Sequence, residues 1–244
     1  MVRSLLWRGL LVGLLGALLA FAFAHRFGAP QVDQAIAFEG ARQGALGAVA
    51  EPELVSRAVQ RSAGLLAGLC IYGLALGGLF SLAFAAAHGR VARVRPRATA
   101  ALLALAGFLA VVIVPLTKYP ANPPSIGSDD TIERRTQLYL ALVAISVLGV
   151  VAAYRVARSL VGRWDPWNAA LSAAAVYLAI VVGAQAALPS VSATPDGFPA
   201  DVLWDFRAAS LGIQAVLWGT VGLGFGALAE RALATRARHR PPAA

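Results

Sequence analysis

Few side chains in this sequence could bind a metal ion, and those few lie beside apolar segments. There are three histidines, His25, His88 and His239, and no two of them share a predicted loop. Transition metals in proteins are held mainly by histidine, cysteine and carboxylate groups. We therefore predict no histidine cluster within the chain, and we interpret His88 and His239 as polar residues at a membrane interface.

His25 is better placed to meet an incoming cation, because it ends an apolar segment on the side of the chain that carries most carboxylates. The sequence predicts an entry site for a metal cation formed by His25, Glu39, Asp201 and Asp205. Two other interpretations stay open. His25 is also typical of a polar residue at a helix end, and the aspartates stand four apart, where they would cap a helix or complement its positive end.

The sequence gives little support for disulfide, nucleotide-binding, zinc-binding or catalytic chemistry. The single cysteine, Cys70, lies in an apolar stretch and excludes an internal disulfide. The sequence has no GxxxxGK[ST] string for ATP and no HExxH string for zinc. Deep in the apolar segments the polar groups are uncharged, for example Gln185 and Gln214, and we expect Gln214 to hydrogen-bond between helices. We predict that the protein is not an enzyme and holds no permanent cofactor.

The elements that position these residues are membrane helices. Hydrophobic residues make up 59% of the chain and charged residues 14%, whereas soluble domains carry about a quarter charged residues. A bilayer core needs about 20 apolar residues as a helix. Six segments qualify, at 5–24, 62–87, 99–117, 136–154, 168–188 and 208–229. The predicted fold class is an all-α integral membrane protein, with six transmembrane helices in one membrane domain over residues 1–230.

The first segment has a second interpretation. Arg3 and Arg8 precede its apolar run, and Ala22-Phe23-Ala24 resembles the cleavage site of a signal peptide. Cleavage after residue 24 would leave five helices. The length of the apolar run favours a retained helix.

The orientation follows from the basic residues, which favour the cytoplasmic side of a membrane. With both termini cytoplasmic, 13 of the 21 lysines and arginines lie inside, with 2 of the 12 carboxylates. The net charge of +9 is thus a topology signal that indicates a lipid surface and no nucleic acid as partner. We expect residues 231–244 to be a disordered basic tail.

Aromatic and small residues fit this topology. Tryptophan and tyrosine collect at membrane interfaces, and the expected anchors are Trp7, Trp164 and Trp167 inside and Tyr119 and Trp204 outside. Glycines four apart allow helices to approach closely. Such pairs occur at Gly9/Gly13, Gly64/Gly68, Gly73/Gly77 and Gly222/Gly226. We interpret them as packing contacts within the chain and not as a dimer motif.

The outer loops are the distinctive part of the sequence. The first, over about 25–61, is long, and the second contains Lys-Tyr-Pro-Ala-Asn-Pro-Pro at 118–124, which the prolines make stiff and extended. Three other strings stand out: Arg-Ser-Leu-Leu-Trp-Arg-Gly-Leu at 3–10, Arg-Arg-Thr-Gln-Leu-Tyr at 134–139 and Phe-Pro-Ala-Asp-Val-Leu-Trp-Asp-Phe-Arg at 198–207. In these strings the chain resembles the CbtA family of probable cobalt transporter subunits. The residues that mark the resemblance in the outer loops are Lys118, Tyr119, Pro120, Asn122, Phe198, Pro199, Trp204 and Arg207.

The resemblance implies a multi-pass protein of the bacterial inner membrane that handles cobalt for cobalamin synthesis, with Co²⁺ as the substrate. It also implies a small one-span partner that bears a histidine-rich metal motif. A different class of function stays open beside it, namely a membrane scaffold that stabilises a partner and transports nothing. The absence of charged residues from the middles of the predicted helices favours that alternative.

Overall fold

The computed structural model describes residues 2–47, 55–89, 94–124, 129–191, 194–195 and 197–238. Within these ranges the chain forms helices and no strand. Six helical stretches are long and apolar enough to cross a membrane, which confirms the predicted fold class. The orientation of the termini stays a prediction.

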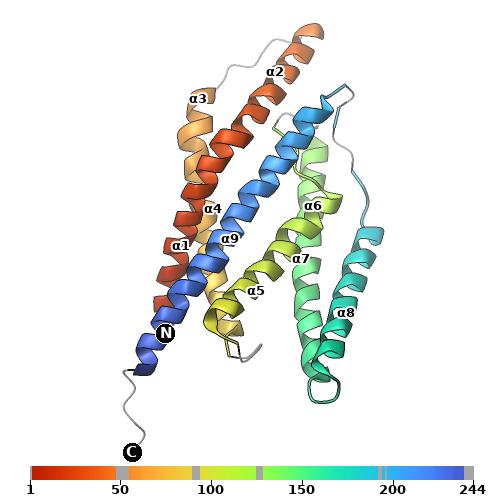
Figure 1. Cartoon of the computed structure of the whole chain (residues 1–244). Coiled ribbons are helices and arrows are strands. Elements are labelled where there is room, and N and C mark those ends of the chain that lie inside the picture. The colour runs from red at the N-terminus through yellow and green to blue at the C-terminus, as the bar shows by residue number, and fades with distance from the viewer. Residues whose placement is uncertain are drawn as a thin grey trace, which may run out of the picture. The chain divides into compact units, whose positions relative to one another are not determined.

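The six stretches are longer than the predicted apolar segments. The first is continuous through α1 (Val2–Phe23), a π-helical turn (Ala24–Gly28) and α2 (Ala29–Ala45). The second contains α3 (Arg57–Val59), a π-helical turn (Gln60–Gly64) and α4 (Leu65–Ala87). The third contains α5 (Pro96–Phe108), a π-helical turn (Leu109–Ile113) and α6 (Val114–Lys118). The last three are α7 (Asp129–Leu160), α8 (Pro166–Ala187) and α9 (Ala200–Arg238) (Figure 1).

Two expectations for irregular chain need correction. The first outer loop, expected over about 25–61, is helical as far as Ala45 and again from Arg57. The described part of the predicted disordered tail is also helical, because α9 continues to Arg238. Polar composition suggested loop in both places, but a helix that emerges from a membrane core can continue into water with its hydrogen bonds intact.

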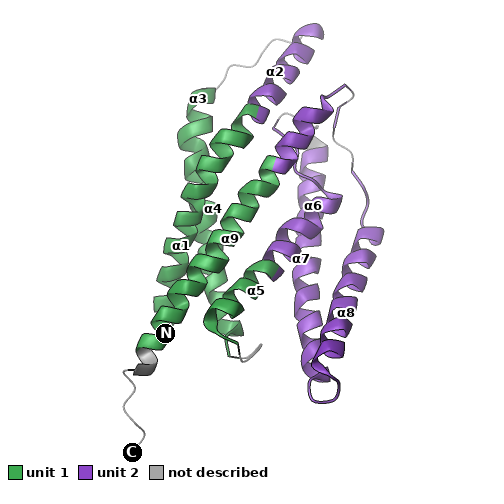
Figure 2. Ribbon diagram, viewed as in Figure 1, with its two compact units in different colours: residues 1–30, 49–105, 209–244 green, residues 31–48, 106–208 purple. Residues whose placement is uncertain are grey.

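The chain divides into two compact units, coloured separately in Figure 2. Unit 1 contains residues 1–30, 49–105 and 209–244, and unit 2 contains residues 31–48 and 106–208. Three continuous helical stretches pass from one unit to the other: α1 into α2, α5 into α6, and α9.

In unit 1, α1 and α4 pack antiparallel with their backbones in contact. A Cβ placed on Gly13 would lie 2.9 Å from the carbonyl carbon of Gly73, and one on Gly9 would lie 3.1 Å from that of Gly77. Such proximity is possible only without side chains. Gly9/Gly13 and Gly73/Gly77 therefore pack helices within one chain, as predicted. The prediction is wrong for Gly64/Gly68, because a Cβ on Gly68 would meet nothing within 4 Å and one on Gly64 only the Val59 carbonyl oxygen.

Helix α9 completes the core of unit 1. Phe225 is fully buried, and its ring lies edge-on to Phe80 and Phe84 of α4 at centroid distances of 5.4 and 5.0 Å. Further along the same two helices, the Tyr72 hydroxyl donates to Oε1 of Gln214 at 3.2 Å. The hydrogen bond predicted for Gln214 between helices is thereby confirmed.

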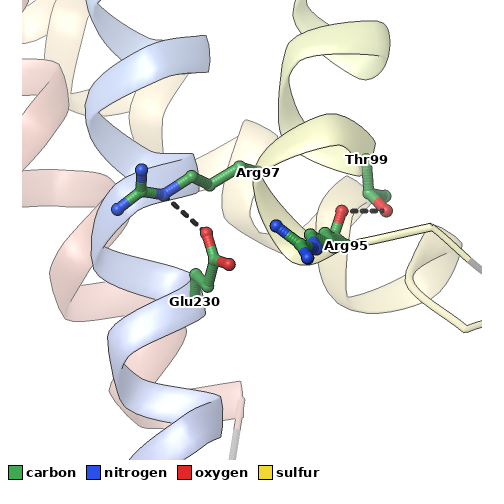
Figure 3. Close-up of polar contacts among 4 residues, drawn as sticks. All are labelled: Arg95, Arg97, Thr99 and Glu230. Atoms are coloured by element: carbon green, nitrogen blue, oxygen red, sulfur yellow. Dashed lines mark hydrogen bonds and ion pairs between the residues drawn. The ribbon is translucent and has the colours of Figure 1, made fainter.

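One end of unit 1 carries an ion pair between α5 and α9. Nε of Arg97 lies 2.5 Å from Oε2 of Glu230, and the nearby Thr99 hydroxyl donates to the Arg95 carbonyl at 3.3 Å (Figure 3). Both charged side chains keep solvent access, so the pair adds little stability. Just beyond the ion pair, the small residues Gly222 and Gly226 of α9 pack on Ala104 and Ala100 of α5.

In unit 2, α7 and α8 form an antiparallel pair. Gly149 makes room for Tyr177 and Ile180, and the Tyr177 hydroxyl shares a 2.8 Å hydrogen bond with the buried Ser146. The turn between the helices ends at Asp165, whose carboxylate accepts from the Trp167 N–H at 2.9 Å and caps α8.

Proline explains the π-helical turn that leads into α6. Pro115 has no N–H to donate to the carbonyl four residues earlier, which is that of Val111. The Tyr139 hydroxyl of α7 donates to this carbonyl at 3.2 Å. A freed carbonyl within a membrane helix is thus satisfied by a neighbouring helix, and the third stretch is attached to α7.

Candidate functional site

The loop that follows α6 is held by buried polar contacts within unit 2. Tyr119 is 3% exposed, and its hydroxyl donates to the Pro189 carbonyl at 2.7 Å. Burial raises the pKa of the Tyr119 phenol above its ordinary value, so the group remains a neutral donor. Tyr119 was expected to be an aromatic anchor near the outer interface, and its ring is enclosed by protein.

Lys118 fastens the same loop to the end of α8. Its ammonium donates to the Gln185 carbonyl at 2.6 Å and to the Ser190 hydroxyl at 3.5 Å. The Gln185 side chain donates in turn to the Thr117 hydroxyl at 2.9 Å. The ends of α6 and α8 are therefore bound to each other by reciprocal hydrogen bonds.

Two arginines from other helices reach the next residues of the loop. Arg135 of α7 donates to the Pro120 carbonyl at 2.6 Å. Arg207 of α9 donates through Nε to the Ala121 carbonyl at 3.2 Å and through Nη2 to Oδ1 of Asn122 at 3.1 Å. We call Lys118, Tyr119, Asn122, Arg135 and Arg207 the cationic loop cluster.

The charge of this cluster decides what it can bind. Lys118, Arg135 and Arg207 are cations, and Arg207 is near enough to Arg135 for their charges to repel. In the part of the chain that the structure describes, none of the three forms an ion pair with a carboxylate. A divalent cation would be repelled here, so the cluster is not a metal entry site.

The remaining string of the resemblance, residues 198–207, begins α9. The Phe198 ring packs edge-on against Phe38 of α2, with centroids 5.0 Å apart, and Pro199 immediately precedes the helix. Trp204 is 72% exposed, as expected of an interfacial anchor. Arg135 belongs to the string 134–139, but the sequence alone does not show that it lies near Arg207. The arginine pair before a membrane helix was the available signal.

The structure locates the four residues of the predicted entry site without testing it. His25 is exposed in unit 1, with Nδ1 3.2 Å from the Arg61 carbonyl oxygen. Glu39, in unit 2, accepts from the Gln43 amide at 3.1 Å. Asp201 and Asp205 are exposed on the first turns of α9, and Asp201 is inside the helix rather than its N-cap.

No group of three histidine, cysteine or carboxylate side chains suited to a metal ion occurs among the described residues. The entry site formed by His25, Glu39, Asp201 and Asp205 stays a prediction. His25, Asp201 and Asp205 are exposed and Glu39 is half-buried, and none of the four is held by a second such ligand in the described ranges.

Six apolar helices and polar groups concentrated at the helix ends define a multi-pass α-helical membrane protein. A family model described as "Probable cobalt transporter subunit (CbtA)" matches residues 2–230, which include all of the six membrane helices except the end of α9. The chain belongs to the CbtA family. No curated protein and no solved structure matches it.

Proposed function

We propose that the protein is the multi-pass subunit of a Co²⁺ transporter in the bacterial inner membrane, that it supplies cobalt for cobalamin synthesis, and that it acts with a small one-span, histidine-bearing partner. The observation that carries the proposal is the family match, which extends through all six membrane helices. The chain has only three histidines and one cysteine, so a partner that contributes imidazole ligands would complement it.

Deleting the gene should lower cobalt accumulation in cells, and re-expression with the partner should restore it. Radioactive cobalt is supplied at a limiting concentration to four strains: the parent, the deletion, and the deletion carrying this chain alone or with the partner. Equal accumulation in all four would contradict the proposal. Purified chain in liposomes, without the partner, then separates transport from scaffolding, because a scaffold alone gives no cobalt flux at any concentration.

Alanine at His25, Glu39, Asp201 and Asp205 together should reduce cobalt uptake several-fold at low cobalt. The effect should disappear at saturating cobalt, because an entry site that binds the substrate without driving a later step changes KM and leaves the maximal rate unchanged. Glu133→Ala is the matched control, since Glu133 is an exposed carboxylate on the first turns of α7. Unchanged uptake in the quadruple variant would remove these residues from the entry path.

A further inference from the structure

The cationic loop cluster has more hydrogen-bond donors than the described part of the chain satisfies. A guanidinium carries five N–H donors. In the described part of the chain, Arg135 makes one side-chain hydrogen bond and Arg207 makes two, all to neutral oxygens of the loop. The two arginines donate to the carbonyls of consecutive residues, Pro120 and Ala121, and their charges are near enough to repel, so the two guanidiniums share one region of the loop.

Asn122 adds a third unsatisfied group at the same place. Its Oδ1 accepts from Arg207, but its Nδ2 is buried and has no acceptor among the described residues. A buried donor without an acceptor is costly, and such groups in folded proteins normally have a partner. An oxygen-rich anion beside the two guanidiniums would supply that partner and offset their mutual repulsion.

The position of the cluster along the helices indicates which anion this is. Lys118 ends α6, the apolar part of α9 begins after Arg207, and Arg135 precedes the apolar part of α7. These residues therefore lie at the depth of the lipid headgroups, where phosphodiesters are the abundant oxygen anions. Trp204, one helical turn before Arg207, is 72% exposed, as is typical of a side chain that contacts lipid at this depth.

We propose that Arg135, Arg207 and Asn122 bind the phosphate of a phospholipid headgroup. Planar guanidiniums donate pairs of N–H groups to phosphate oxygens, and the Asn122 amide contributes a neutral donor that a purely electrostatic attraction would not need. The bound phosphate would join α7, α9 and the loop after α6, and it would do so independently of cobalt.

The test measures thermal unfolding of the full chain, purified in dodecyl maltoside, during titration with dioctanoyl phosphatidylglycerol. Dioctanoylglycerol, which has the same acyl chains without phosphate, and inorganic phosphate serve as the comparison ligands. A hundredfold excess over the dissociation constant should raise the unfolding midpoint by roughly 5–10 °C with phosphatidylglycerol. Inorganic phosphate and dioctanoylglycerol should give much smaller shifts.

Variants assign the effect to the cluster. Arg207→Gln should weaken the apparent affinity at least tenfold. Asn122→Asp retains an oxygen for Arg207 and replaces the unsatisfied donor by a carboxylate, so it should lose the lipid response while the protein stays folded. Arg134→Gln is the matched control, because Arg134 is exposed beside Arg135 and its substitution removes the same charge.

Three results would overturn the proposal. Equal lipid responses in the wild type, Arg207→Gln and Asn122→Asp would place the lipid elsewhere. A full shift with inorganic phosphate would show a soluble-anion site. A shift produced by the partner subunit and not by phosphatidylglycerol would show that a carboxylate of the partner occupies the cluster. Native mass spectrometry of the purified chain should retain one phospholipid fewer in Arg207→Gln than in Arg134→Gln.

Discussion

Leucine at Gly13 should destabilise unit 1 by about 3 kcal/mol or more, the upper part of the range for overpacked interiors. A Cβ at Gly13 would lie 2.9 Å from the Gly73 carbonyl carbon and 3.2 Å from the Gly77 Cα. These are backbone atoms of α4, so no rotamer change relieves the contact. The helices would have to separate, which removes the packing at Gly9 and Gly77 as well.

The comparison with Gly68 isolates packing from helix propensity. Gly68 is on the same helix as Gly77, but a Cβ there meets nothing within 4 Å. Gly77→Leu should therefore unfold at a much lower concentration of sodium dodecyl sulfate than the wild type, whereas Gly68→Leu should match or exceed the wild type, since leucine favours helix over glycine by roughly 1 kcal/mol. Equal losses at Gly68 and Gly77 would contradict the packing argument. No loss at Gly13 would indicate that residues 1–24 are removed as a signal peptide.

The contrast between these glycines also shows how much of the helix packing the sequence can predict. Spacing identified Gly9/Gly13, Gly64/Gly68, Gly73/Gly77 and Gly222/Gly226 as equivalent motifs. In the fold, the first and third pairs meet each other, the last meets alanines of α5, and Gly68 faces open space. Hydropathy reports that a helix is in the membrane, but pairing between helices depends on contacts far apart in the chain.

The extension of the first helix was missed for a local reason. Residues 29–45 are polar and contain Pro30, a pattern typical of a loop. The π-helical turn Ala24–Gly28 ends two residues before Pro30, and it widens the helix where the proline cannot donate. The helix therefore passes the proline without ending, as the third stretch does at Pro115.

The functional strings were recognised separately, and only the fold shows that they meet. Lys118–Asn122, Arg135 and Arg207 come from three segments, and each looks like an ordinary helix end. The positive charge of their assembly could not be anticipated, because the outer side taken as a whole has more carboxylates than basic residues. The enclosure of Tyr119 could not be predicted either, because the rule for aromatic anchors gives depth but does not distinguish a lipid-facing ring from an enclosed one.

Arg207→Met should lower the free energy of unfolding by about 3 kcal/mol in dodecyl maltoside. It removes two charge-assisted hydrogen bonds and leaves the Ala121 carbonyl and Oδ1 of Asn122 without their donor. Arg135→Met should cost less, because one hydrogen bond is lost. Arg134→Met, at an exposed position, should change stability by less than about 0.5 kcal/mol and serves as the control.

Combining Arg135→Met with Arg207→Met tests the repulsion between these two arginines and its neutralisation by phosphate. Each single variant loses its own hydrogen bonds but also relieves the repulsion, and the double variant can relieve it only once. Without lipid, the double variant of Arg135 and Arg207 should therefore lose more stability than the two single losses together. With phosphatidylglycerol at a concentration that saturates the wild type but neither single variant, the sign should reverse, because either single substitution already releases most of the shared phosphate. A coupling of the same sign and size in both conditions would mean that no lipid anion lies between these side chains, and that the cluster acts on the loop alone.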